Sequence, residues 1–299
     1  MSKTPGPSGF SFFSTAEDVT EGLDLTGKTY LITGSNSGIG HETMRVLAMR
    51  GAHIIAAART EEKAIGALSA IGHDGTPLAC ELSEPSHVRA AVQAVKEGGR
   101  TLDGIIANAG IMALPELNLK HGYELQFLTN HIGHFILVNG LVDQLAPNGR
   151  VVMLSSGAHR IAPEAGIEFD NFDGSQHYKA WTAYGQSKMA NILFANALAK
   201  RFEGSGRTAN SVHPGVIQTN LMRYRDDYDA VYERIGHDNL KTMGQGAATQ
   251  TYVATHPSLA KVSGTYFADS NVKGTRAPAQ DAELAEKLWQ WTEAAVAKL

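Results

Sequence analysis

Tyr184 and Lys188 are the two residues of this chain whose types and spacing point most directly to chemistry. They stand four residues apart, which is close to one α-helical turn, so in a helix the phenol and the ammonium project from one face with Cβ atoms about 5–6 Å apart. A proton-transfer group then lies beside a fixed positive charge. Taken alone, the pair also fits a solvent-exposed helix face, so its meaning depends on the rest of the chain.

The charge of Lys188 matters because tyrosine is a weak acid. The free phenol has a pKa of about 10, so a phenolate useful at neutral pH needs about 4 kcal/mol of stabilisation. At an effective dielectric constant of ~20, one charge about 4 Å from the oxygen supplies about that much. A single lysine is therefore enough to activate Tyr184, provided that it approaches closely.

The composition is that of a globular protein with a large core. The chain has 299 residues, of which 43% are hydrophobic and 19% charged. Its formal net charge is −4 and it carries no long basic run, so we expect no nucleic-acid partner. Cys80 is the only cysteine, which excludes an internal disulfide and fits a reducing compartment, with the cytoplasm as the expected location.

The first residues read as an extension to the main domain. Residues 1–9 are rich in Pro, Gly and Ser, lack the apolar core of a signal peptide, and no run of about 18 apolar residues follows. We therefore expect neither secretion nor a membrane span. Ser14 and Glu17 have the spacing of a capping box, which predicts a short helix ending at Gly22. We divide the chain into a partly disordered extension, residues 1–24, and a single domain, residues 25–299.

Strands and helices alternate along this domain. Apolar runs bounded by turn residues predict strands at 29–33, 53–58, 77–80, 102–107, 150–154, 208–212 and 264–268. Helical patterns follow the glycine-rich turn 34–40 as far as residue 50, and recur at 60–70, 84–97, 123–145 and 183–201. The alternation implies a doubly wound α/β domain of about seven mostly parallel strands with helices on both faces. Such a sheet binds ligands at the carboxyl ends of its strands.

A glycine-rich turn follows the first strand. Gly34, Gly38 and Gly40 allow a close backbone approach, and the helix that the turn opens favours an anion at its N-terminus. The spacing Gly-x-x-x-Gly-x-Gly differs from the commoner Gly-x-Gly-x-x-Gly, and such a turn can be merely a turn. Its position after the first strand of an alternating chain favours dinucleotide binding.

Arg59 follows the second strand, where an acidic residue would hold the two ribose hydroxyls of NAD. A cation there suits a 2′-phosphate, so we expect NADP in preference to NAD. Arg59 could equally be a solvated surface residue or stack on the adenine.

Polar residues end the next two strands. Asn108, Ala109 and Gly110 follow the fourth strand, and Ser155 and Ser156 follow the fifth. An asparagine can simply cap a turn and paired serines are common in loops. All of these residues nevertheless fall on the same edge of one sheet, where a hydroxyl can hydrogen-bond a substrate oxygen.

Two histidines, His131 and His134, lie three residues apart on one predicted helix. Because no carboxylate or cysteine stands at a helpful spacing, we expect packing or local hydrogen bonding and no metal site.

Together these motifs resemble the short-chain dehydrogenase/reductase family, over residues 25–270. The resemblance rests on Thr33-Gly34, Gly38-Ile39-Gly40, Asn108-Ala109-Gly110, Asn130, Ser156, Tyr184, Lys188 and Pro214-Gly215. Residues 26–28, 130–135 and 211–215 further resemble the retinol dehydrogenase and WW-domain oxidoreductase branch. The family implies a Rossmann fold and an NAD(P)-dependent oxidoreductase that transfers a hydride between its cofactor and an alcohol, aldehyde or ketone.

The resemblance also implies a role for each catalytic residue. Tyr184 would be the general acid/base and Ser156 would hold the reacting oxygen. Lys188 would lower the pKa of the tyrosine and bind the nicotinamide ribose, while Asn130 would hold a water in a proton relay. An acid/base with a pKa near the working pH is what hydride transfer at an alcohol carbon requires.

The implied cofactor contacts run along the same edge. They are Gly34, Ser35, Asn36, Ser37, Gly38, Ile39 and Gly40 around the phosphates, Arg59, Glu81, Leu82, Asn108, Ala109 and Gly110 towards the adenosine, and Tyr184, Lys188, Pro214, Gly215, Ile217 and Thr219 at the nicotinamide end. Glu81 departs from the family pattern, which often has Asp near the adenine. Ala107 also departs from it, since an asparagine often precedes Asn108.

The family further implies a homodimer or homotetramer that pairs through the helices at 123–145 and 183–201. Residues 218–243 are the expected substrate lid. A non-catalytic dinucleotide-binding regulatory or scaffold protein is the alternative function, because fold alone does not imply activity. A sugar-nucleotide epimerase would need a larger C-terminal domain than the about 85 residues that follow Gly215.

Overall fold

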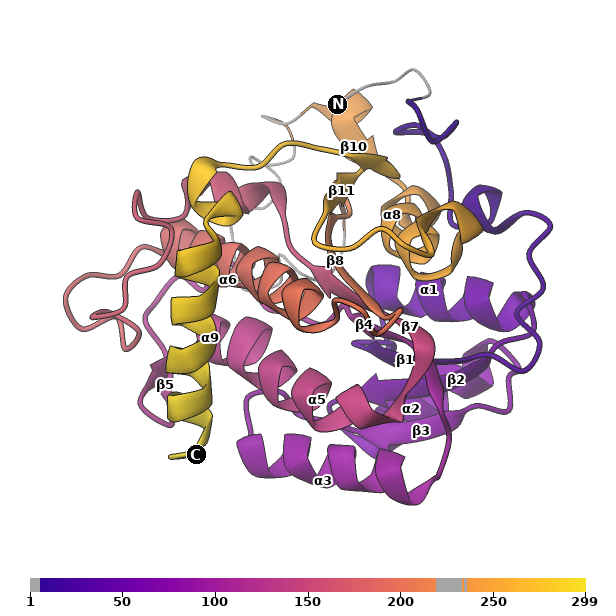
Figure 1. Ribbon diagram of the computed structural model, residues 1–299, viewed down its shortest axis with the longest axis horizontal. Helices are drawn as coiled ribbons and strands as arrows, with labels where there is room; N and C mark the ends of the chain where they lie inside the picture. Colours follow the sequence, from indigo (N-terminus) through magenta and orange to yellow (C-terminus); the bar gives the residue numbers. More distant parts are fainter. Residues whose placement is uncertain (1–5, 219–232, 234–235) are drawn as a thin grey trace.

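The computed structural model describes residues 6–218, 233 and 236–299 (Figure 1). Its main sheet has the strand order β12-β11-β8-β7-β4-β1-β2-β3. The strands are β1 Thr29–Thr33, β2 His53–Ala58, β3 Thr76–Ala79, β4 Leu102–Ala107, β7 Leu145–Leu154, β8 Thr208–His213, β11 Tyr266–Ala268 and β12 Asn271–Val272. All the predicted strands are present, and β12 adds one antiparallel strand at the edge, where two residues are too few to form a sequence pattern.

The strand order reverses between β1 and β4. From β1 the chain proceeds outward to β2 and β3, and from β4 it proceeds in the opposite direction to β7, β8 and β11. β1 pairs with both β2 and β4 in parallel. The loops that leave β1 and β4 therefore diverge, which opens a crevice at the carboxyl edge of the sheet.

Helices cover both faces of the sheet, as predicted. They are α1 Gly38–Met49, α2 Glu61–Ala70, α3 Pro85–Glu97, α5 Gly133–Leu141, α6 Ala180–Arg201, α8 Met243–Thr255 and α9 Ala282–Val296. α1 packs beside α8, while α3, α5, α6 and α9 form the other layer (Figure 1). Successive strand residues serve opposite layers: Ile105 and Val151 face α5 and α6, whereas Ile106 and Val152 face α1 and α8.

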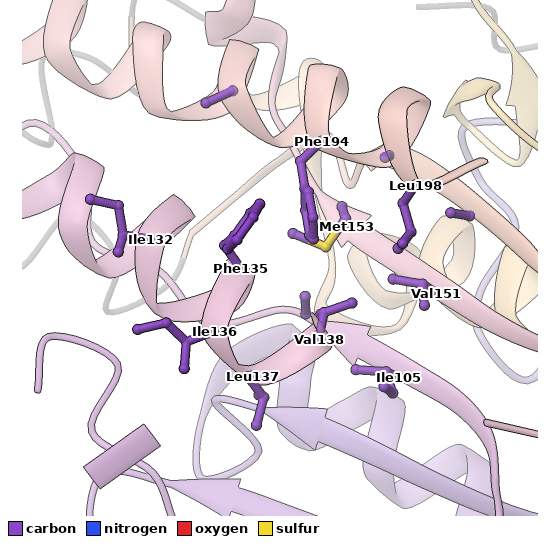
Figure 2. Packing of buried hydrophobic residues seen from close by; sticks show 14 of the residues in the cluster. Ile105, Ile132, Phe135, Ile136, Leu137, Val138, Val151, Met153, Phe194 and Leu198 are labelled. Atoms are coloured by element: carbon purple, nitrogen blue, oxygen red, sulfur yellow. The ribbon is translucent and has the colours of Figure 1, made fainter. Parts of the chain in front are cut away.

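The layer of α5 and α6 is the larger core. Phe135 of α5 and Phe194 of α6 lie against each other with ring centroids 5.1 Å apart. Figure 2 shows Met153 and Val151 of β7 near these rings, with Leu198 beside Phe194 on the same helix. This packing fixes α6 against the ends of the central strands, and α6 carries Tyr184 and Lys188.

The predicted helix at 123–145 is broken into shorter pieces. Residues Tyr123–Glu124 form β6, which pairs with β5 (Leu119–Lys120) in a hairpin. α4 (Leu125–Phe127), a π-helical turn η2 (Leu128–Ile132) and α5 follow, and a 3₁₀ turn η3 (Val142–Gln144) leads into β7. The prediction was wrong at both ends because Glu124 caps the helix start, accepting the N–H groups of Gln126 and Phe127, while Leu145 already belongs to β7.

The N-terminal extension differs in detail from its prediction. The reciprocal cap is one residue later than expected: Thr15 N–H donates to Asp18, and Asp18 N–H donates to the Thr15 hydroxyl. It begins a single 3₁₀ turn, η1 (Asp18–Thr20), instead of a longer helix. Phe12 is 2% exposed and the Phe10 ring lies 5.4 Å from that of Tyr252, so the described part of the extension packs on the domain.

The expected lid lies mostly outside the described residues, as does Thr219. At its borders, β9 (Val216–Ile217) pairs in parallel with β10 (Leu240–Lys241). A 3₁₀ turn η6 (His237–Asn239) precedes β10. The two ends of the segment therefore meet beside the carboxyl end of β8.

Gly133, the first residue of α5, has no room for a side chain. An added Cβ would lie 2.3 Å from the carbonyl oxygen of Leu82. Because the obstacle is backbone, Gly133→Ala should lower the free energy of unfolding by about 1–3 kcal/mol, measured by urea denaturation. In the control Gly66→Ala, in α2, the added Cβ would meet nothing within 4 Å, and the free energy should stay the same or rise by up to about 1 kcal/mol. Equal losses in both variants would contradict this packing.

Candidate active site

One large cavity of about 1190 Å³ lies along the carboxyl edge of the sheet. Most of the predicted site residues line it: Gly34, Asn36, Ser37, Gly38, Ile39, Gly40, Arg59, Glu81, Leu82, Asn108, Ala109, Gly110, Ser156, Tyr184, Lys188, Pro214, Gly215 and Ile217. Ser35 and Asn130 are fully buried behind its wall. The sheet thus brings together residues that are far apart in the sequence.

The glycine turn is packed closely against the end of β4. A Cβ on Gly40 would lie 2.3 Å from the Asn108 amide nitrogen and 2.4 Å from the carbonyl oxygen of Gly34. Gly34 itself has a φ of 68°, which favours glycine. Asn108 donates to the carbonyl oxygen of Thr33 over 2.8 Å. These contacts leave a backbone-lined floor that suits a flat, charged ligand such as a dinucleotide.

The N-terminus of α1 opens onto the same floor. Ser37 is the N-cap residue, yet its side chain accepts no hydrogen bond from the helix. The first-turn N–H groups therefore keep their capacity to bind an anion. Ser35 differs from expectation, because both its hydroxyl and its N–H donate to the carbonyl oxygen of Ala57. Its side chain secures the turn to β2 and does not face the cavity.

Arg59 lies just beyond β2, exposed to solvent and on the cavity wall. Within the part of the chain that the structure describes, its guanidinium makes no hydrogen bond or ion pair. Its donors are therefore available to a phosphate at this end of the cavity.

Tyr184 and Lys188 lie one turn apart on α6, as predicted, and both are buried. The Lys188 ammonium is 5.6 Å from the centroid of the Tyr184 ring and donates to the carbonyl oxygen of Leu154 over 3.1 Å. Burial raises the pKa of Tyr184 to about 12, opposed by a hydrogen bond with Ser156. Burial also lowers the pKa of Lys188 to about 8. The protein by itself therefore keeps the phenol protonated at neutral pH.

Asn130 lies in the π-helical turn, a feature often found at functional sites. Its side-chain oxygen accepts the N–H of Ile111, and its amide donates to the Ile111 carbonyl and to the Ser187 hydroxyl, each over 2.9–3.0 Å. Ser187 in turn donates to the carbonyl oxygen of Tyr184 over 2.7 Å. Asn130 thus ties the segment after β4 to the helix that carries the tyrosine.

His134 joins this turn to β1. Its Nδ1 lies 3.0 Å from the carbonyl oxygen of Asn130 and its Nε2 lies 2.9 Å from the Thr33 hydroxyl. A carbonyl can only accept, so Nδ1 carries the proton. Burial lowers the pKa of His134 to about 4, so the ring is neutral and Nε2 accepts from Thr33. The Thr33 oxygen also accepts the N–H of Ala109 over 2.9 Å.

His131, three residues before His134, is hydrogen-bonded to a residue of α9. His131 Nε2 lies 3.1 Å from the Thr292 hydroxyl of α9, and burial lowers the pKa of His131 to about 3. Both histidines are buried and hydrogen-bonded, His131 to Thr292 and His134 to Asn130 and Thr33. Among the described residues, no group of three His, Cys, Asp or Glu side chains could hold a metal ion.

Several other cavity residues were not among the predicted site residues, although Trp181 was a candidate for a pocket wall or a core position. Apolar side chains on the wall include Met112, Leu114, Leu125, Ile161 and Trp181. The Trp181 ring lies 6.2 Å from that of Tyr184, edge to face. His213, the last residue of β8, also lines the cavity. His213 belongs to the segment 211–215 that carried the resemblance to the retinol dehydrogenase branch, but the sequence assigned it no role of its own.

The comparisons with known proteins agree with this geometry. A family model described as short chain dehydrogenase matches residues 28–169. The short-chain dehydrogenase TIC 32 A, chloroplastic, of Brassica napus is 42% identical over 96% of this chain and 94% of its own length. Retinol dehydrogenase 14 of Homo sapiens is 36% identical over 92% of this chain and 88% of its own. The chain therefore belongs to the short-chain dehydrogenase/reductase family and resembles its retinol dehydrogenase branch.

A solved structure adds the cofactor class. A short-chain dehydrogenase from Burkholderia cenocepacia, in complex with NADP, superimposes with a TM-score of 0.66 at 26% identity, covering 81% of this chain and 96% of that one. Together with the family, this makes the protein an NAD(P)-dependent oxidoreductase acting on small molecules. Within the described residues, no helix is both long and apolar enough to cross a membrane.

Proposed function

We propose that the protein is an NADP-preferring alcohol dehydrogenase or carbonyl reductase in which Tyr184 is the general acid/base. The observation that carries this proposal is the presence of Tyr184, Ser156 and Lys188 on the wall of the same cavity as the glycine turn. A bound nicotinamide cofactor would supply or accept the hydride. The glycine turn, Arg59 and Asn108 are the residues that would hold its phosphates and adenosine.

The proton chemistry is assigned to the chain's own side chains. Because burial raises the pKa of Tyr184 to about 12, the phenol is protonated at neutral pH and is ready to donate to an oxygen that gains charge during carbonyl reduction. Ser156 accepts the N–H of Ala158 over 3.1 Å, and its hydroxyl is also hydrogen-bonded to Tyr184, so the two hydroxyls can reach one substrate oxygen. Ser156 would therefore hold the same substrate oxygen as Tyr184.

The supporting residues have distinct proposed roles. Lys188 would contact the nicotinamide ribose and place a positive charge beside the phenol, and Asn130 would support a water in a proton relay. The apolar wall around Trp181 and Met112 suits a small to medium, partly apolar alcohol, aldehyde or ketone. Residues 218–243 would form the substrate lid, and residues 1–24 an extension to the single domain of residues 25–299.

Replacing Tyr184 with Phe tests the mechanism. Loss of the hydroxyl should lower kcat for carbonyl reduction about 10²–10⁴-fold, followed as NADPH oxidation over a panel of aldehydes and ketones. NADPH binding, measured by fluorescence, should change little. Tyr123→Phe is the matched control, because Tyr123 is absent from the cavity wall. Unchanged turnover in Tyr184→Phe would refute the acid/base role, while NADPH binding without turnover by the wild type would favour the regulatory or scaffold alternative.

Replacing Arg59 with Ala tests the cofactor preference. If the guanidinium binds a 2′-phosphate, the KM for NADPH should rise at least about tenfold, corresponding to about 1.4 kcal/mol. The KM for NADH should rise less than about twofold, since NADH lacks that phosphate. Equal increases for the two cofactors would contradict the proposed contact.

A homodimer or homotetramer is also proposed, but the structure restricts how copies can meet. Within one chain, Trp289 of α9 lies 5.0 Å from the Phe135 ring and 5.5 Å from the Phe194 ring, and α9 runs alongside α6 (Figure 1). Pairing through these aromatic side chains would have to displace α9. Within α5 only Asn139 and Gly140 are partly exposed, so the proposed pairing through α5 and α6 would also require α9 to move. Light scattering at micromolar concentration should give the mass of two or four chains, and the mass of one chain would contradict the proposal.

The cytoplasm stays the proposed location. Its support is a single cysteine, Cys80, whose buried thiol has a pKa raised by desolvation to about 12 and so is unreactive towards oxidants. Cell fractionation that recovers the protein with organelles would contradict it.

A further inference from the structure

The peptide unit between Ser156 and Gly157 lies between two imidazole rings. The Ser156 carbonyl oxygen is 2.7 Å from His159 Nδ1, and the Gly157 nitrogen is 3.1 Å from His213 Nδ1. Both polar atoms of a single peptide unit are thus bonded to histidine side chains. This unit directly follows the side chain that is proposed to hold the substrate oxygen.

The partners of the two rings determine their tautomers. A carbonyl oxygen can only accept, so His159 carries its proton on Nδ1. A backbone N–H can only donate, so His213 Nδ1 is unprotonated and its proton lies on Nε2. His213 must therefore be neutral for its bond to exist, and a neutral His159 is of the opposite tautomer.

Each ring is held by a different element. His213 ends β8, whose preceding residue Val212 accepts the N–H of Ser155 over 2.8 Å. His159 lies in the 3₁₀ turn η4 (Gly157–Ile161) and packs edge to face on Tyr266 of β11, with ring centroids 5.1 Å apart. Its Nε2 is buried and without a hydrogen-bond partner among the described residues, so a second proton there would be buried unpaired.

We propose that His159 and His213 are positioning residues that clamp the Ser156–Gly157 peptide and so aim the Ser156 hydroxyl at the reacting oxygen. The inference rests on the proposed function of Ser156. Rotation of this peptide would turn the Ser156 backbone and move its hydroxyl. A displacement of about 1 Å in a positioning group can cost about 10²-fold in rate.

The charges around the two rings favour the neutral forms. His213 faces Lys241, Asp269, His159 and Arg160. Lys241 and Asp269 form a buried ion pair of 2.8 Å, so Lys241 is largely compensated. Burial is the main reason that the pKa of His213 falls to about 4.

The surroundings of His159 also favour a neutral ring. Burial lowers the pKa of His159, and the facing Arg160 and Arg276 lower it further. Tyr266, which covers the ring, is uncharged because burial raises the pKa of its phenol above the ordinary value. The clamp is therefore formed at neutral pH and fails as the pH falls towards 4, when a proton on His213 Nδ1 would face the N–H of Gly157.

Nuclear magnetic resonance of protein labelled with ¹⁵N-histidine tests the tautomers without any activity. At pH 7, His213 should show a protonated Nε2 and His159 a protonated Nδ1, each signal assigned by its disappearance in His213→Asn or His159→Asn. The Gly157 amide signal should shift together with the His213 nitrogens as the pH is lowered. The same tautomer in both rings, or a charged His213 at pH 7, would overturn the clamp.

Kinetics test the positioning role. Asn presents an oxygen near the place of Nδ1, so His213→Asn keeps an acceptor for Gly157, whereas His213→Leu removes it. His213→Leu should lower kcat about 10–100-fold with the cofactor KM changed less than about twofold, and His213→Asn should recover most of the loss. At position 159, the side-chain amide of Asn can donate to the Ser156 carbonyl oxygen, whereas Leu cannot. His159→Leu should therefore lower kcat, and His159→Asn should recover most of the loss.

Two further readouts separate the possible failures. Circular dichroism melting shows whether each leucine variant is folded. If a leucine variant is unfolded, the kinetics of the asparagine variants and the tautomers seen by nuclear magnetic resonance still test the clamp. Alcohol oxidation with NADP⁺, which tolerates acid, should slow in both proteins as the pH falls because the phenol of Tyr184 is the base. The ratio of the wild-type rate to the His213→Asn rate should fall further as the pH approaches 4, since only the wild type has the titrating His213. A wild type without turnover would refute the proposed function but not the tautomers. Equal kcat in wild type and folded His213→Leu would refute the positioning role.

Discussion

The site depends on the reversal of strand order between the neighbouring strands β1 and β4. Because the strand order reverses there, the loops leaving the two strands diverge, and the backbone groups at the strand ends lose their regular partners. Buried backbone groups must still be hydrogen-bonded. The Asn108 amide donates to the Thr33 carbonyl oxygen, and the Thr33 hydroxyl oxygen accepts the N–H of Ala109. These side chains take the place of the hydrogen bonds between backbone groups that end where the strands diverge. The glycine turn can then pack against Asn108, which forms the floor of the cavity.

A chain of neutral polar side chains connects the ends of β1 and β4 to the part of the cavity wall that holds Tyr184 and Lys188. His134 extends the hydrogen bonds of Thr33 to Asn130, and Asn130 reaches α6 through Ser187. In a medium of low dielectric constant, such a network is rigid when every member is paired and costly when one is removed. Burial keeps His134 uncharged, as it keeps Tyr184 protonated. The site is therefore organised by dipoles, with the ammonium of Lys188 at its centre.

The sequence predicted the parts of the site that follow from regular repeats. The strands at 29–33, 53–58 and 102–107 have the predicted bounds because apolar runs between turn residues define them, and the spacing of Tyr184 and Lys188 required only a helix. The π-helical turn and the histidine clamp could not be predicted, since both depend on loop paths that bring distant residues together. The reliance on one lysine to activate Tyr184 neglected burial, which only the folded structure reveals.

Burial also sets the resting charge state of Tyr184 and Lys188. The free phenol has a pKa of about 10, and the fold raises it to about 12 while lowering the pKa of Lys188 to about 8. Each residue is thus displaced towards its uncharged form, because the low-dielectric wall disfavours both charges. A protonated phenol is the starting state for carbonyl reduction, whereas alcohol oxidation must first remove that proton. At neutral pH the protein's own residues therefore hold a protonated phenol beside the ammonium of Lys188, whose positive charge favours loss of the phenol proton when an alcohol is oxidised.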